Sequence, residues 1–149
     1  MLFLCLLSYQ PVGAQINVNI NTGIQPAWGP VGYDYVDYYY LPDVDAYYYV
    51  PKRQYIYQEN KKWVFARRLP VRYQTYDIYN GYKVVINEPR PYLHHETYRV
   101  KYQSFKGGRG NRQVIIRESH DARYKNNGRT NNPHQDKGNG KNKGKGKGH

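Results

Sequence analysis

The chain has very little cysteine and no long apolar run. Cys5 is the single cysteine among 149 residues, so no disulfide can form within the chain, and its stability must come from packing. The apolar run over residues 1–7 is far shorter than the roughly 20 residues that a transmembrane helix needs. We therefore expect neither a disulfide scaffold nor an ordinary transmembrane anchor.

The sequence also lacks the common motifs of enzyme active sites. It has no glycine-rich phosphate loop, no G-x-S-x-G elbow and no H-E-x-x-H metal helix. The stretch Ser119-His120-Asp121 holds the residue types of a catalytic triad, but a triad is assembled by geometry and not by adjacency, so we interpret it as linker. We predict a protein that is not an enzyme and that takes no cofactor.

Two groups of side chains keep a small metal-dependent hydrolase open as an alternative. His94-His95-Glu96 offers ligand types, yet adjacent side chains on a helix point about 100° apart and do not readily converge on one metal. The second group is an acidic cluster, formed by Asp34, Asp37, Asp43 and Asp45. Its spacing does not match a calcium-binding loop, and we interpret these aspartates as turn residues. We predict no metal ligands and no catalytic residues.

The first residues have the pattern of an export signal. After the apolar run, Pro11 leads to the short residues Val12-Gly13-Ala14, where signal peptidase would cut. We predict a signal peptide over residues 1–14, followed by an extended N-terminal segment over residues 15–32. Cleavage would also remove Cys5. The alternative is an apolar N-terminal strand in a cytosolic protein.

Positive charge is concentrated at the C-terminal end. Of 23 lysines and arginines, 13 lie in residues 101–149, together with only 3 of the 11 acidic residues. From Gly107 onward large apolar residues almost vanish, apart from Val114-Ile115-Ile116 and Tyr124. Such a composition cannot bury enough apolar surface to offset the entropy of ordering. We predict that residues 106–149 form a disordered basic tail rich in glycine, lysine and asparagine.

The predicted tail has three possible roles. The simplest is solubility, because a solvated charge run needs no partner. The second is adhesion to an anionic envelope polymer or polysaccharide. The third is binding to nucleic acid, which is disfavoured because the tail has no interleaved aromatic residues that could stack on bases.

Tyrosine is far more frequent than usual. The chain has 19 tyrosines, and 17 of them fall within residues 33–102. Tyrosine favours strands, and Pro-Asp, Pro-Lys-Arg and Glu-Asn-Lys separate the runs, as expected for short antiparallel hairpins. The predicted strands cover residues 38–41, 46–50, 54–58, 62–66 and 82–87.

The alternation within these strands predicts which side chains meet. Tyr55 and Tyr57 share one face of their strand and Ile56 points to the other. In the next strand Trp63 and Phe65 share a face, and we expect them to lie opposite the two tyrosines as cross-strand aromatic pairs.

The remaining elements complete the predicted fold. The unbroken Val84-Val85-Ile86 indicates burial on both faces of the last strand. In residues 69–79, Tyr73, Tyr76 and Tyr79 are three apart, which either places them on one side of a short helix or is accidental in a chain so rich in tyrosine. Residues 92–105 have helical spacing, with Pro91 suited to the first turn. The fold class is mainly β, a small antiparallel meander with a short C-terminal helix, within a tyrosine-rich domain over residues 33–105.

Several motifs carry a family resemblance. They are Tyr38-Tyr39-Tyr40-Leu41-Pro42-Asp43, Tyr47-Tyr48-Tyr49-Val50, Tyr55-Ile56-Tyr57, Lys62-Trp63-Val64-Phe65, Leu69-Pro70 and Gly81-Tyr82-Lys83-Val84-Val85. With them, residues 26–102 resemble a family of small exported proteins of unknown function from Gram-negative bacteria, chiefly Bacteroidetes. The resemblance implies a periplasmic or envelope location and brings no activity. The chain departs from the pattern at Asn60-Lys61, where such proteins often have glycine, which indicates a different turn type.

The aromatic residues exceed what a core of this size is expected to hold, which predicts exposed tyrosines of the kind found on binding faces. We therefore expect a non-enzymatic structural or binding module that uses an aromatic surface and a cationic tail. Trp28 precedes the strands, and we interpret it as a residue that caps the core. The candidate surface consists of Trp28, Tyr38, Tyr40, Tyr47, Tyr49, Tyr55, Tyr57 and Trp63.

Overall fold

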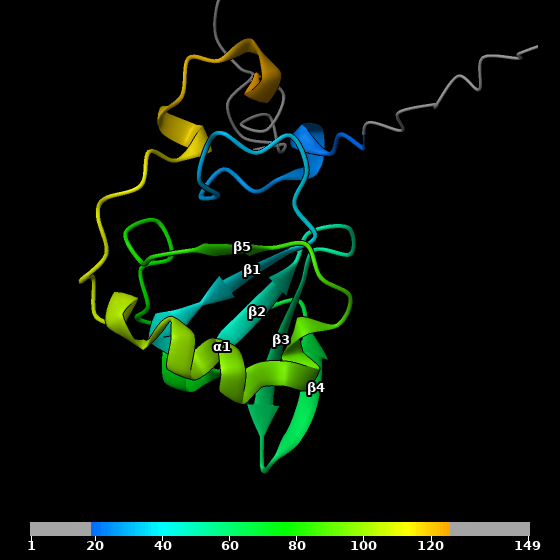
Figure 1. Cartoon of the computed structure of the whole chain (residues 1–149), viewed down its shortest axis with the longest axis vertical. Helices are drawn as coiled ribbons and strands as arrows, with labels where there is room; N and C mark the ends of the chain where they lie inside the picture. Colours follow the sequence, from blue (N-terminus) through cyan, green and yellow to red (C-terminus); the bar gives the residue numbers. More distant parts are fainter. Residues whose placement is uncertain (1–18, 126–149) are drawn as a thin grey trace, which may run out of the picture.

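One antiparallel sheet of five strands forms the centre of the molecule (Figure 1). The computed structural model describes residues 19–125. The sheet order is β4-β3-β2-β1-β5, so the first four strands form the predicted meander and β5 returns to pair with β1. The bounds are β1 Tyr38–Leu41, β2 Ala46–Tyr49, β3 Gln54–Glu59, β4 Lys62–Ala66 and β5 Val84–Ile86. The predicted fold class is confirmed, although β5 is shorter than the predicted strand over residues 82–87.

Both faces of β1 and β2 are largely buried, whereas β4 at the edge of the sheet is partly exposed. Successive residues of a strand point to opposite faces, so each run of three tyrosines places rings on both sides of the sheet. Tyr38, Tyr40 and Tyr47 pack on one face with Ile56, while Tyr39 packs on the other. As a result, every residue of β1 is buried.

A short helical segment covers the first of these faces. The predicted helix over residues 92–105 is an α-helix of seven residues, α1 His95–Lys101, between two 3₁₀ turns, Pro91–His94 and Gln103–Phe105. Pro91 occupies the first turn, as predicted. The face that α1 turns to the sheet carries the buried residues His95 and Tyr98.

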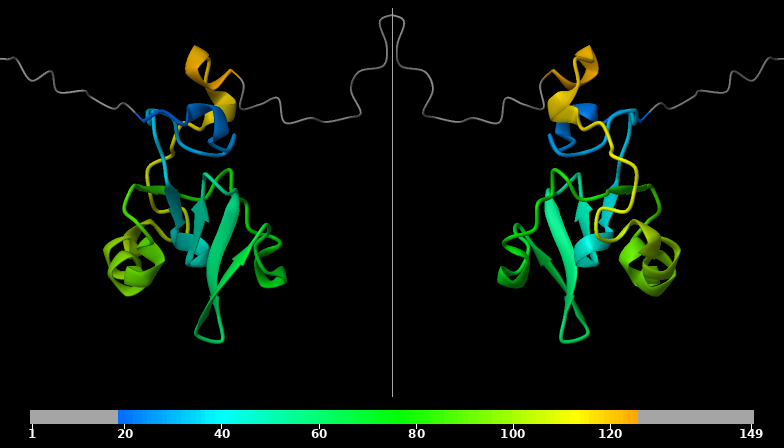
Figure 2. Two further views of the ribbon diagram at one scale, coloured as in Figure 1. Left: turned by 90° about the vertical axis from the view of Figure 1, so that its right-hand side faces the viewer. Right: turned by 90° about the vertical axis from the view of Figure 1, so that its left-hand side faces the viewer.

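The opposite face is covered by residues 69–79, which lie on the other side of the sheet from α1 (Figure 2). Their only helical turn is the 3₁₀ helix Val71–Tyr73. Tyr73, Tyr76 and Tyr79 are partly buried and pack against the core cluster of this face. The spacing of these tyrosines therefore reflects burial of an irregular segment and not a regular helix.

The β3–β4 hairpin corrects the predicted aromatic pairing. Its two-residue turn, Asn60-Lys61, has positive φ at both positions, 50° and 62°, as a type I′ turn requires. This turn sets the pairs Ile56↔Phe65 and Tyr57↔Val64, so Phe65 lies opposite Ile56 and not opposite a tyrosine. The prediction was wrong because a two-residue turn pairs odd positions of β3 with even positions of β4.

At one end of the sheet, the N-terminal segment packs against residues from the C-terminal part of the described chain (Figure 1). Pro30 and Ile115 form an antiparallel bridge, and the amide of Ile116 donates to the carbonyl of Gly29 at 2.8 Å. Tyr124 closes this contact, because its hydroxyl accepts from the amide of Gly32 at 3.0 Å. The remaining 3₁₀ helices are Thr22–Ile24, Pro42–Val44, Ile116–Glu118 and Ala122–Tyr124.

This end packing places the boundary of the fold later than expected. The sequence predicts residues 106–125 as part of the basic tail, but Ile115, Ile116 and Tyr124 are buried. The few apolar residues of this stretch are buried because they pack against the N-terminal segment. The predicted signal peptide over residues 1–14 and the predicted tail beyond residue 125 lie outside the described residues. Within residues 19–125, no helix has the length and apolar character needed to cross a membrane.

Candidate functional site

The predicted aromatic surface is largely buried. Trp28, Tyr38, Tyr40, Tyr47 and Tyr57 are each no more than 8% exposed. The other three members, Tyr49, Tyr55 and Trp63, are half-buried. These residues are core because both faces of the sheet are covered, and the structure does not bring them together as a binding face.

The tyrosine rings pack on one another and their hydroxyls find polar partners. Tyr38 stacks on Tyr49 with ring centroids 4.6 Å apart, across the β1–β2 pair. The hydroxyl of Tyr40 donates to Asp45 at 2.9 Å. Aromatic side chains with a satisfied hydroxyl can fill a core, so this chain holds many more tyrosines inside than we expected.

The group His94-His95-Glu96, which kept a metal-dependent hydrolase open as an alternative, is divided between two separate contacts. His95 is buried, and its Nδ1 lies 3.2 Å from the hydroxyl of Tyr47. Burial lowers the pKa of His95 below its ordinary value. Glu96 points elsewhere and pairs with Arg99 at 2.6 Å. Among residues 19–125, no three histidine, cysteine or acidic side chains gather as a metal site would require.

The predicted acidic cluster is divided among separate structural contacts. Asp34 pairs with Arg123, and Asp37 accepts from the hydroxyl of Tyr35. Asp43 and Asp45 both bind the segment that follows α1. Asp43 accepts a hydrogen bond from the amide of Gly107, and Asp45 forms an ion pair with Lys106 at 3.0 Å.

The Ser-His-Asp stretch is not a triad. The carboxylate of Asp121 caps the 3₁₀ helix Ala122–Tyr124, because it accepts from the amide of Arg123. The hydroxyl of Ser119 accepts from the amide of Asp121 at 3.1 Å. Both contacts stabilise local backbone.

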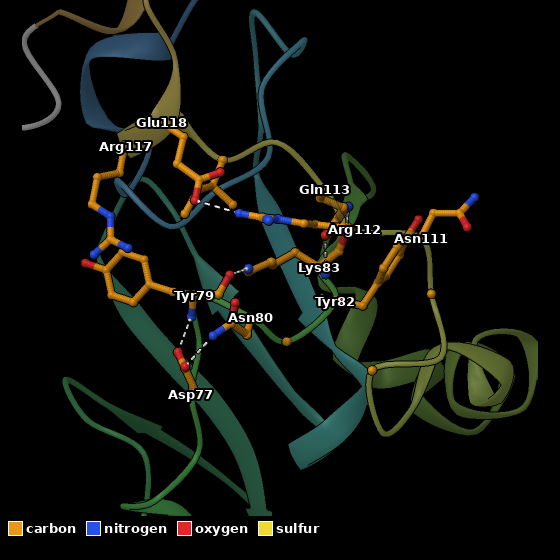
Figure 3. Close-up of a pocket in the computed structure, with 14 residues that line it drawn as sticks. Asp77, Tyr79, Asn80, Tyr82, Lys83, Asn111, Arg112, Gln113, Arg117 and Glu118 are labelled. Carbon is orange, nitrogen blue, oxygen red and sulfur yellow. Dashed lines mark hydrogen bonds and ion pairs between the residues drawn. The ribbon is translucent and has the colours of Figure 1, made fainter.

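A polar pocket lies where the start of β5 meets residues 108–118 (Figure 3). Its volume is about 330 Å³, at the lower end of the range of small-molecule sites. One wall is the turn before β5, and the other is formed by residues 108–118, which belong to the predicted tail. The side chains that define its chemistry are Asp77, Tyr79, Lys83, Arg112, Arg117 and Glu118.

Lys83 is the central group of this pocket. It is only 2% exposed, and its Nζ donates to the carbonyl of Tyr79 at 2.9 Å. Burial lowers the pKa of its ammonium to about 8, against the opposing effect of Asp77 and more distant carboxylates. In the described part of the chain, no carboxylate forms an ion pair with Lys83.

A side chain from the C-terminal segment holds the backbone of Lys83 in place. The amide of Lys83 donates to Oε1 of Gln113 at 2.9 Å, and Nε2 of Gln113 donates back to the carbonyl of Lys83 at 2.8 Å. This pair imitates the hydrogen bonds of a neighbouring strand. The C-terminal segment is thereby fixed against the end of β5.

Two arginines add positive charge to the pocket. The guanidinium of Arg117 lies over the ring of Tyr79, 4.0 Å from its centroid. Arg112 extends toward Glu118 at 3.2 Å, as Figure 3 shows. The nearby carboxylate of Asp77 is engaged in the turn, where it accepts from the amide of Tyr79 and from Asn80. Stacking and pairing orient the arginines while leaving further N–H groups for a ligand.

The turn at the pocket requires glycine. A Cβ on Gly81 would lie 2.1 Å from the hydroxyl oxygen of Tyr76. That hydroxyl is buried and finds no hydrogen-bond partner among residues 19–125. The close approach of this backbone to a buried ring fixes one wall of the pocket.

Sequence reasoning did not find this site. The sequence predicts Lys83 within an ordinary strand and Arg112, Gln113 and Arg117 within the tail. The one available signal was the apolar run 114–116, whose flanking residues are polar or basic. Such a run inside a basic segment indicates a stretch that returns to the fold.

Comparison of the chain with protein-family models, with curated proteins and with solved structures finds no match, so the geometry of the pocket carries the functional argument.

Proposed function

We propose that the protein is a non-enzymatic binding module whose Lys83 pocket holds a small anion, a carboxylate or a phosphate ester. The observation that carries the proposal is the burial of a lysine without a carboxylate partner, at the wall of a polar pocket. Burying an unpaired charge is costly, and an anion bound beside it would offset that cost.

The other lining groups fit this ligand class. Arg117 and Arg112 supply guanidinium groups, which match the planar geometry of carboxylates and phosphates. Asn111 also lines the pocket. The ligand would be small, because the pocket is about 330 Å³.

We further propose that the module acts outside the cytoplasm, in the periplasm or envelope. The support is the pattern of residues 1–14 in the sequence. N-terminal sequencing of the protein isolated from cells checks this. A mature chain that begins at Gln15 is expected, and a chain that retains residues 1–14 would contradict export.

Calorimetric titration of the full chain tests the pocket, with inorganic phosphate, malate and a hexose phosphate as ligands. We expect Lys83→Met to weaken binding of the best ligand by about tenfold or more, since a charge-assisted hydrogen bond is worth roughly 1.5–3 kcal/mol. Arg117→Gln should weaken it as well. Affinity should also fall above pH 8, where the Lys83 ammonium loses its proton.

Arg109→Gln is the matched control, because Arg109 is exposed and does not line the pocket. It should leave the affinity within about twofold of wild type, as expected for a screened surface charge. Equal losses in Arg109→Gln and Lys83→Met would reduce the effect to general electrostatics and contradict the proposal. Absence of binding for all three ligands would contradict it too.

A further inference from the structure

A second hollow lies on the face of the sheet opposite α1. It is open, has a volume of about 510 Å³, and lies beside the turn between β2 and β3. It shares no lining residue with the Lys83 pocket. Its lining consists of Tyr48, Lys52, Arg53, Tyr55 and Arg67.

The three cations of this hollow are unpaired. Five other exposed cations of the described chain are paired with carboxylates, namely Arg72, Arg99, Lys106, Arg112 and Arg123, whereas Lys62, Lys101 and Arg109 are single unpaired charges outside the hollow. Lys52, Arg53 and Arg67 have no such partner within residues 19–125. Like charges around one hollow repel one another, and an anion placed between them would remove that repulsion.

The turn holds Arg53 in an unusual conformation. Its φ is 52°, in the left-handed region, and its amide donates to the carbonyl of Val50 at 3.1 Å. Glycine adopts this conformation without the steric cost that a side chain brings. The arginine therefore occupies a position where the backbone alone would favour glycine.

The aromatic walls favour a sugar over a nucleic-acid base. The rings of Tyr48 and Tyr55 meet edge to face with centroids 4.9 Å apart, and Tyr48 is only 8% exposed. Stacking a base requires an exposed ring face, which the buried ring of Tyr48 and the half-buried ring of Tyr55 packed against it do not offer. A carbohydrate with charged groups needs the cations and polar groups at the rim, which this hollow has.

The chain's own C-terminal residues do not suit this hollow. Residues 126–149 contain six lysines and arginines against one aspartate, so their charge has the same sign as the hollow. The whole chain carries a formal charge of +12, which attracts anionic partners over a distance. We propose that the hollow formed by Lys52, Arg53 and Arg67 is a second binding site, which takes an acidic polysaccharide.

The test measures binding of the full chain to an immobilised polyuronate at physiological salt, where attraction from scattered exposed charges is screened. The variant combines Lys52→Gln, Arg53→Gly and Arg67→Gln. We expect it to lose about tenfold or more in affinity, because charge-assisted contacts are removed. A matched control replaces Lys62, Lys101 and Arg109 by glutamine, which removes the same charge from residues outside the hollow.

The control should keep its affinity within about threefold of wild type, since it removes only screened surface charge. Equal losses in the two variants would overturn the proposal, and so would failure of the wild-type chain to bind polyuronate. Single-stranded DNA is the second probe: if it binds as tightly and is lost in the same variant, the site takes nucleic acid and the proposal is wrong. Phosphate binding in the Lys83 pocket should persist in the triple variant, so each site is tested separately.

Discussion

At the scale of one residue, burial of Lys83 lowers the pKa of its ammonium group. An amino group that is protonated in the unfolded chain up to about pH 10.5 loses its proton in the folded protein near pH 8. Between these values the unfolded chain binds more protons than the folded chain. The free energy of unfolding must therefore rise with pH across this window, because raising the pH relieves the cost of the buried charge.

This linkage predicts the behaviour of Lys83→Met. In the wild-type chain, stability should increase by on the order of 1–2 kcal/mol between pH 7.5 and 9.5, below the range where tyrosines of the unfolded chain ionise. The variant should lack this increase. Urea unfolding at a series of pH values measures both, and Arg109→Gln should behave like wild type. A wild-type stability that is flat or falling over this interval would contradict the assignment of Lys83 as a buried cation.

At the scale of an element, residues 106–125 support both the fold and the pocket. Ile115 bridges to Pro30 and is only 3% exposed, and Gln113 holds the backbone of Lys83. A truncation at residue 107 would therefore remove structural contacts together with the tail. A truncation after residue 125 would leave every described element in place.

Neighbouring residues in this element provide a matched test. Ile115→Ala should lower the free energy of unfolding by about 2–4 kcal/mol, as large-to-small changes at buried positions do. Val114→Ala should change it by less than about 0.5 kcal/mol, because the Val114 side chain is 57% exposed. Urea unfolding compares the two, and phosphate titration should show weaker binding for Ile115→Ala, since Ile115 also lines the pocket. Similar effects of both substitutions would mean that this segment does not pack as described.

At the scale of the whole molecule, tyrosines fill much of the core, where most proteins have aliphatic residues. Tyr39, Tyr40 and Tyr47 are among the largest side chains that are fully buried. Burial raises the pKa of each of them, and raises that of Tyr55 to about 12. The unfolded chain therefore releases phenolic protons at a lower pH than the folded chain.

Alkaline titration tests this tyrosine core. Because the folded pKa values are raised above the unfolded value of 10.0, their contribution to stability is complete below pH 10 and is lost as the pH rises further. Tyrosinate absorbance from Tyr39, Tyr40, Tyr47 and Tyr55 should appear in a cooperative step above pH 11 that coincides with loss of circular dichroism. In urea the same tyrosines should titrate near pH 10. If Tyr39, Tyr40, Tyr47 and Tyr55 ionised reversibly in the native chain near pH 10, they would be exposed and the description of the core would be wrong.

Local patterns predicted the elements of this fold well. The runs of tyrosine, the proline-containing turns and the alternation in β3 concern neighbours in sequence, and the observed strands follow them closely. The pairing of β3 with β4 was predicted wrongly, although the length of the Asn60-Lys61 turn determines it. The correct register could have been predicted, because the number of residues in the turn fixes which positions of the two strands lie opposite each other.

The burial of the aromatic residues could not be predicted in the same way. An alternating strand looks the same in sequence whether one face or both faces are covered. Whether a face of this sheet is buried depends on α1, on residues 69–79 and on the end packing. These segments are distant in sequence from the strands that they cover. This is why a predicted binding surface is in fact the core.

The sequence by itself determined the strands, the hairpin order of the first four, the region of the short helix and the uneven distribution of charge, because each follows from the properties of neighbouring residues. The pairing of β5 with β1 joins residues far apart in sequence and was decided by the tertiary structure. Only the tertiary structure decided which tyrosines are buried and where a ligand could bind. Lys83 and Gln113 are 30 residues apart, and their contact depends on how the segment after α1 returns to the end of β5. No pattern within either segment contains that information.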